Sequence, residues 1–167
     1  MENLKVKGEV FINGKSIGSN AVTYLASRLI ISMLATGTPI KVSHVFLVKA
    51  DAANDPYNTA ISATEHNSEL FEACDLENVI AVGSDASVSG DSASGVSVSF
   101  NSTLSTAISV TNTYTYMFLV ANGDSKTVLT SGNKYKLRGY EKVVSAIPLI
   151  NVDKIKSITW KLTLKAS

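Results

Sequence analysis

The last strand-like segment of the chain limits most strongly what the chain can fold into. Residues Lys154 to Lys165 read KIKSITWKLTLK, so apolar and polar residues alternate through them. Because successive side chains of a β-strand point to opposite faces, one face of this segment is apolar. A strand that buries a tryptophan needs an apolar sheet to close against. The earlier β-rich segments are therefore expected to assemble around this strand, whose apolar face carries Ile158, Trp160, Leu162 and Leu164.

Length and turn spacing predict the fold class. A chain of 167 residues is typical of one domain with its own core, so residues 1–167 are expected to form a single domain. Glycine, asparagine and aspartate punctuate the β-rich segments at short intervals, which is the pattern of antiparallel β proteins. The sequence therefore predicts a mainly β fold, an antiparallel β-sandwich or jelly roll, with one long helix near the N-terminus.

That helix is expected over Ala21 to Ala35, about four turns long. Ser19 or Asn20 offers the cap, and Gly37 supplies the stop. Its main apolar stripe consists of Val22, Leu25, Ala26, Leu29 and Met33. The apolar arc is widened by Ile30, Ile31 and Leu34, so the helix is either buried on two sides within its own domain or covered by another subunit.

The N-terminal segment alternates apolar and polar residues from Leu4 to Ile12 and ends at the turn signal Asn13-Gly14. Residues 1–12 are therefore expected to form a strand or an extended arm. A terminal strand can pair with an edge of its own sheet or with a neighbouring subunit. The residues expected at an interface are Leu4, Val6 and Val10.

The middle of the chain contains further expected elements. They are a strand over Ile40 to Lys49, an irregular loop over Ala50 to Ala60, a short helix over Thr64 to Asp75, Ser/Thr-rich strands between Ser84 and Thr113, a central strand over Tyr114 to Ala121, and a strand over Tyr135 to Val144.

Catalytic signatures are weak in this sequence. Ser92 lies in Gly90-Asp91-Ser92-Ala93-Ser94-Gly95, which does not have the G-x-S-x-G spacing of a hydrolase nucleophile. Ser131 and Lys134 match S-x-x-K in letters only, because a hairpin turn is expected there. The histidines are His44 and His66, and His44 is expected to be a hydrogen-bonded core or interface residue. No catalytic residue is assigned, and the protein is expected not to be an enzyme.

Metal and cofactor signatures are equally weak. Glu65, His66 and Glu69 are close in sequence but are better explained as helix caps and solvated charge. The loop residues Asp51, Asn54, Asp55 and Asn58 offer oxygen ligands without the order of an EF-hand, so weak calcium binding there stays open. Cys74 is the single cysteine and is expected to be a small buried hydrophobe. No metal, cofactor or small-molecule substrate is expected, and Asn101 begins an N-glycosylation sequon.

Total charge bears on the class of partner. Lys and Arg number 15 and Asp and Glu 14, which leaves a net charge of +1 and no basic excess for nucleic acid or an anionic membrane. The N-terminus lacks the pattern of a signal peptide, and no apolar run is long enough to span a bilayer. Only 17% of residues are charged, and such a surface is suited to packing against copies of itself.

The order of features resembles small β-sandwich virion proteins, the tail, fibre-adaptor and capsid proteins of bacterial and archaeal viruses. The likeness rests on the early helix, on Phe46 to Thr64, on Glu69-Leu70, on the aromatic strand Tyr114 to Val120 and above all on the closing strand Asp153 to Leu164. The chain departs from the tail-protein pattern at Val48-Lys49, where a glycine is expected, and in its long serine tract.

This resemblance implies a non-enzymatic virion structural protein that acts by homo-oligomeric assembly, as a capsid or tail component, with copies of itself and other virion proteins as partners. One alternative is a filament subunit or adhesin at the cell surface or outside the cell, which donates its N-terminal strand to a neighbour. The other is a carbohydrate-binding sandwich that stacks sugars on Trp160, Tyr114, Tyr116 or Tyr135.

Overall fold

The computed structural model describes residues 4–38, 41–50, 74–91, 93–110, 116–121, 128–130, 134–136 and 142–166. Within these ranges the chain is mainly β, with one helix. The elements are β1 (Leu4–Ile12), β2 (Lys15–Val22), α1 (Tyr24–Thr36), β3 (Val42–Ala50), β4 (Cys74–Ala81), β5 (Gly83–Asp91), β6 (Gly95–Ser109), β7 (Tyr116–Ala121), β8 (Val128–Thr130), β9 (Lys134–Lys136), β10 (Lys142–Pro148) and β11 (Lys154–Ala166).

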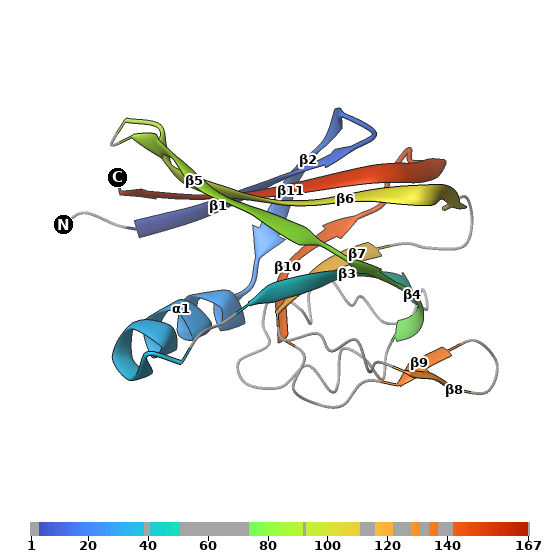
Figure 1. Cartoon of the computed structure of the whole chain (residues 1–167), viewed down its shortest axis with the longest axis horizontal. Helices are drawn as coiled ribbons and strands as arrows, with labels where there is room; N and C mark the ends of the chain where they lie inside the picture. Colours follow the sequence, from blue (N-terminus) through green and yellow to red (C-terminus); the bar gives the residue numbers. More distant parts are fainter. Residues whose placement is uncertain are drawn as a thin grey trace.

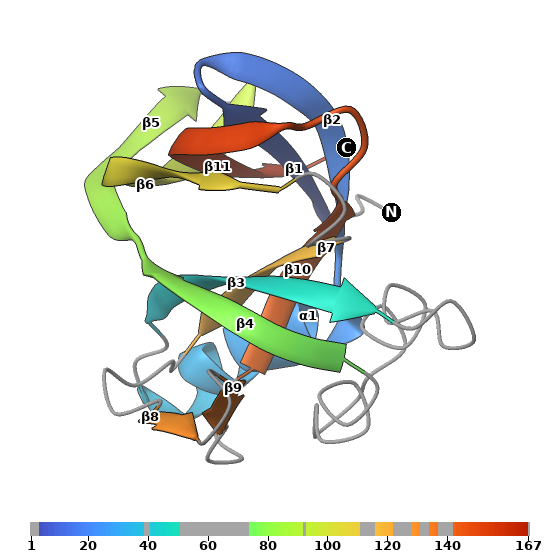
Figure 2. The same ribbon diagram turned by 90° about the vertical axis from the view of Figure 1, so that its right-hand side faces the viewer.

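Two antiparallel sheets face each other in a sandwich-like arrangement (Figures 1 and 2). The hydrogen-bonded order is β4-β3-β7-β10-β2-β1-β11-β6-β5, and β2 is shared. The upper sheet of Figure 1 contains β2, β1, β11, β6 and β5, and the lower sheet contains β10, β7, β3 and β4. On one side β2 crosses from the upper sheet to the lower sheet. On the other side β4 of the lower sheet continues through Val82 into β5 of the upper sheet. A small hairpin of β8 and β9 completes the described strands.

The β1–β2 hairpin turns at Asn13 and Gly14, which both have positive φ, at 54° and 79°. Ile12 pairs with Lys15, so the loop has two residues, and asparagine and glycine are the residues that favour such a turn. The Asn13 side chain also binds β11: its Nδ2 donates to the Lys154 carbonyl at 2.9 Å, and its Oδ1 accepts from the Lys156 amide at 2.8 Å. The hairpin is therefore tied to the point where the pairing of β11 with β6 shifts register.

β2 changes sheets at Asn20. Lys15 to Asn20 pair with β1, whereas Ala21 and Val22 pair with β10. At the crossing the Asn20 Nδ2 donates a hydrogen bond to Ser145 Oγ in β10. Gly8 lies opposite Asn20, and a Cβ at Gly8 would overlap the Asn20 side chain. The missing side chain of Gly8 thus leaves room for the polar contact that joins the sheets.

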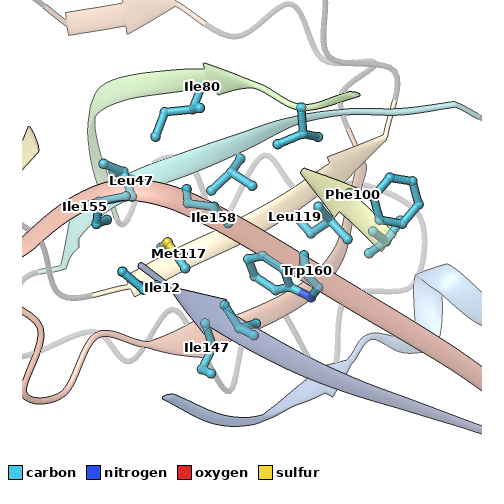
Figure 3. Packing of buried hydrophobic residues seen from close by; sticks show 14 of the residues in the cluster. Ile12, Leu47, Ile80, Phe100, Met117, Leu119, Ile147, Ile155, Ile158 and Trp160 are labelled. Atoms are coloured by element: carbon cyan, nitrogen blue, oxygen red, sulfur yellow. The ribbon is translucent and has the colours of Figure 1, made fainter. Parts of the chain in front are cut away.

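The closing strand β11 lies between β1 and β6, as the alternation predicts for a strand around which the sheet assembles. Val10, Trp160 and Phe100 are registered opposite one another across these three strands. All three side chains belong to the buried core cluster, and Trp160 has no exposed surface. Figure 3 shows Trp160 and Phe100 within this cluster. The expected burial of Trp160 and Ile158 is confirmed.

The lower sheet is buried on both faces. Met117 and Leu119 of β7 point into the core between the sheets, and Phe118 and Val120 belong to a second apolar cluster on the other face. β3 follows the same pattern, with Phe46 in the second cluster. The predicted central strand and the predicted interior strand are confirmed, with bounds Tyr116–Ala121 and Val42–Ala50.

Three predictions about elements need correction. The helix is not long: α1 has 13 residues, and it begins after Thr23 because Ser19 and Asn20 lie in β2, paired with Glu9 and Gly8. The stop at Gly37 is confirmed. Cys74 and Asp75 begin β4 and are not helical, and the rest of the helix expected over Thr64 to Asp75 lies outside the described residues. The strand expected over Tyr135 to Val144 is two strands, β9 and β10.

Candidate functional site: the exposed face of the helix

The start of α1 is fixed to the lower sheet by one buried threonine. Thr23 is the N-cap, and its Oγ1 accepts a hydrogen bond from the Ala26 amide at 3.1 Å. The same hydroxyl donates to the Val143 carbonyl in β10 at 2.8 Å, and the Thr23 amide donates to the Val144 carbonyl at 3.0 Å. Because Thr23 satisfies both the helix and the strand, the direction in which α1 leaves the sheet is defined.

Only part of α1 is covered. Ala26 is buried in the core between the sheets, and Leu29 packs against that core. Towards the C-terminal end of α1 the apolar side chains are exposed: Ile31 to 63% and Leu34 to 74% of their surface. The helix ends at Gly37, whose φ is 70° and whose amide donates to the Met33 carbonyl at 2.8 Å. In Figure 1 this part of α1 extends away from the strands.

We define the helix face as Ile31 and Leu34, which lie one helical turn apart and are the most exposed large apolar side chains in the described part of α1. Beside it, a hollow is lined by Ser27, Arg28, Ile31 and Ser32. Arg28 is the only charged residue of the helix. Large apolar side chains that cluster on a surface mark interaction sites more often than isolated ones do. The exposure of Ile31 and Leu34 shows that this side of the helix is not buried by the described part of its own chain, and cover by another subunit stays a prediction.

The structure places the three residues expected at an interface in an interior strand. β1 pairs with β11 along its whole length and with β2 from Gly8 to Ile12. Val10 is fully buried in the core of its own chain, Val6 is half-buried, and Leu4 is registered opposite Ala166. An interface role for this segment stays a prediction, and the free edge available for it is the β2-facing side of Leu4 to Lys7.

The aromatic residues considered as sugar platforms are not gathered on one surface. Trp160 has no exposed surface and cannot stack on a sugar. Tyr116 is half-buried and packs against the second apolar cluster. Tyr135 lies in β9, and Tyr114 lies outside the described residues.

The residues considered for catalysis or metal binding are mostly not described. Ser92, His66 and the segment from Asp51 to Asn58 lie outside the described residues, as do Ser131, Glu65 and Glu69. His44 is half-buried in β3, and its Nδ1 lies 2.8 Å from Ser43 Oγ, as expected for a hydrogen-bonded histidine. In the part of the chain that the structure describes, no cluster of three His, Cys, Asp or Glu side chains could hold a metal ion.

Reasoning from total charge missed how the charges are distributed. Residues 50–125 contain no lysine or arginine, yet they hold ten of the 14 acidic residues. The net charge of +1 does not reveal this separation of acidic from basic residues, although their positions in the sequence do. Among these ten residues, Asp91 at the end of β5 has a side chain that the structure describes, and it is exposed.

Comparison with protein-family models, with curated proteins and with solved structures finds no match for this chain. Among the described helical residues there is also no stretch with the length and apolar character needed to cross a membrane.

Proposed function

We propose that the protein is a non-enzymatic virion structural protein, a capsid or tail component with a β-sandwich or jelly-roll fold, that acts by homo-oligomeric assembly. Its partners are copies of itself and other virion proteins. The observation that carries assembly is the helix face. Ile31 and Leu34, one helical turn apart, expose most of their surface, while the apolar side chains between the sheets are closed off from solvent. The virion itself is inferred from the resemblance of the closing strand.

Covering the helix face favours association in water. Burying an exposed isoleucine or leucine contributes about 1.5–3 kcal/mol each. Repeated on every copy, that gain stabilises an assembly without a catalytic site or a bound ligand. A subunit with few charged residues also meets little electrostatic repulsion from its neighbours.

The test replaces Ile31 and Leu34 with serine and measures particle size by sedimentation velocity. We expect the double variant to remain folded and to require at least tenfold more protein to assemble. The matched control is Ile150→Ser, because Ile150 is also 66% exposed but lies outside the helix. Equal assembly of the helix variant and the control would contradict a role for the helix face.

A second candidate is the filament subunit or adhesin, located at the cell surface or outside the cell, that associates by strand addition. The observation that favours it is the N-terminal half of β1. Leu4 to Lys7 pair with β11 only, so one side of this short segment is open among the described residues. An added strand would satisfy its backbone groups. Backbone amides alternate sides along a strand, and the Asn13 amide donates to the Ser157 carbonyl of β11, so the amide of Val6 faces the open side and that of Lys5 faces β11. Replacing Val6 by proline would block that association and leave assembly through the helix face intact, because the open side needs backbone hydrogen bonds.

A further inference from the structure

Two buried polar atoms have no hydrogen-bond partner among the described residues. One is the indole Nε1 of Trp160, which is a donor, and the other is the amide Oδ1 of Asn20, which is an acceptor. A buried polar group without a partner costs free energy, and the N–H group of a buried tryptophan usually finds one. Because one atom donates and the other accepts, a single small polar molecule can satisfy both.

The acceptor lies over the middle one of three neighbouring strands, β2, β1 and β11. Asn20 belongs to β2 and is registered opposite Gly8 of β1. The atom nearest to a Cβ built at Gly8 is Asn20 Oδ1, so the amide oxygen occupies the space that a side chain at position 8 would fill. Gly8 pairs in turn with Leu162 of β11. Asn20 therefore extends its unpaired oxygen across β1 towards the strand that contains Trp160.

The donor lies diagonally across from the same glycine. Trp160 pairs with Val10, which is two residues from Gly8 and on the same face of β1. Diagonal neighbours in an antiparallel pair are about 7–8 Å apart, a distance that aromatic side chains can span. Figure 3 shows the Trp160 indole among the apolar side chains of the core. Since Gly8 has no side chain, position 8 contributes none to the space between the indole and the Asn20 amide.

The nitrogen of the same amide fixes the direction of its oxygen. Asn20 Nδ2 donates to Ser145 Oγ of β10 in the lower sheet. Because the two amide atoms point away from each other, holding Nδ2 at the lower sheet turns Oδ1 towards β1 and the upper sheet.

The buried hydroxyl groups of the described residues are those of Thr23, Ser97 and Ser145. Thr23 bonds the start of α1 and β10. Ser97 shares a hydrogen bond with Thr163 at 2.7 Å, and Ser145 accepts from Asn20 Nδ2. Each of these hydroxyl groups thus has a partner other than Trp160 Nε1 and Asn20 Oδ1.

We propose that a buried water molecule binds between these two atoms, accepting a hydrogen bond from Trp160 Nε1 and donating one to Asn20 Oδ1. Water suits the site because it accepts and donates at once, and buried waters typically satisfy polar groups that a protein leaves unpaired. An ion is a poor occupant, since the surrounding core is apolar. The hydrogen bonds then run from β11 through the water and Asn20 to Ser145, which joins the two sheets. This site lies within one subunit and does not depend on assembly.

The test uses the single tryptophan of the chain as its reporter. In the isotope-labelled full-length protein, the Trp160 indole N–H gives one NMR signal, and its cross-relaxation with water is measured by NOE and by ROE. We expect NOE and ROE cross-peaks of opposite sign, which identify a water held near the proton far longer than surface hydration. Cross-peaks of the same sign report proton exchange or fleeting hydration. That result, or the lack of any cross-peak, would overturn the proposal.

If assembly broadens the signal, the same measurement is made in the variant with Ile31→Ser and Leu34→Ser, because both positions are exposed and outside the core.

Variants at the acceptor test whether Asn20 holds the water. Asn20→Leu is similar in size and lacks Oδ1, so we expect the opposite-sign cross-peaks to be lost. Gly8→Ala should also remove them, because a Cβ there displaces the Asn20 amide, and it replaces Asn20→Leu if that variant does not fold. Ser19→Ala is the matched control, since Ser19 is the exposed neighbour of Asn20 in β2, and it should keep the wild-type cross-peaks. Cross-peaks that persist without Oδ1 would contradict the bridge to Asn20.

Discussion

At the scale of single residues, small polar side chains join the elements of the sandwich around a largely apolar core. Thr23 joins α1 to β10, Asn13 joins the first hairpin to β11, and Asn20 joins β2 to β10. Each of these residues makes hydrogen bonds to a partner more than a hundred positions away. Residue types predict that asparagine and threonine favour turns and caps, but they do not predict these distant partners.

Asp91 gives a pH prediction at this scale. Hydrogen bonds from the Ser94 amide, the Ser94 hydroxyl and the Ala93 amide lower its pKa below the ordinary 3.8. A carboxylate whose folded pKa is depressed contributes stability that is fully present above the unfolded pKa and is lost as pH falls through the folded value. We therefore expect part of the acid destabilisation below pH 3.8 to disappear in Asp91→Asn.

The measurement is the thermal midpoint of unfolding as a function of pH for the wild type and for Asp91→Asn. Asp153→Asn is a suitable control, because Asp153 is likewise an exposed aspartate. Parallel curves for the wild type and Asp91→Asn would show that the turn hydrogen bonds do not stabilise the charged form.

At the scale of elements, strong periodicity and turn residues are sufficient to predict most strands and the end of the helix. They do not predict which residues a strand and a neighbouring helix each contain. The closing strand, the first strand with its Asn13-Gly14 turn and the stop of α1 at Gly37 all follow from local sequence. The start of α1 does not. Ser19 and Asn20 are good caps by residue type. Both residues are part of β2, which pairs with β1 and then with β10, so the helix begins later and is shorter than predicted.

The candidate surfaces were predicted less completely than the fold. The wide apolar arc of Ile31 and Leu34 is visible in the sequence, but local sequence does not show that the core covers Ala26 and Leu29 and leaves Ile31 and Leu34 exposed.

Deletion of the first strand is the prediction that belongs to elements. β1 lies between β2 and β11 and buries Val10 and Ile12 in the core. Removing residues 1–12 should therefore give an unfolded or insoluble protein, because two strands lose a partner and the core loses two side chains. A matched deletion of residues 1–3, which precede β1, should leave the circular dichroism spectrum and the melting temperature near wild type. A soluble, folded protein lacking residues 1–12 would show that the strand is dispensable to its own subunit.

At the scale of the whole molecule, the core is closed off from solvent, but one apolar surface stays exposed. The helix face exposes apolar side chains at one end of the molecule. A contact through the helix face should persist at high salt, because burial of apolar surface does not depend on unscreened charge.

We have proposed that this chain works as an assembled structural subunit. Its most direct test is the size of the unmodified protein, measured by sedimentation velocity over a wide concentration range and checked by electron microscopy. We expect a concentration-dependent shift from monomer to larger particles of regular shape, with no monomer left at high concentration. A single monomeric species at every concentration, with no particles on the grid, would contradict it.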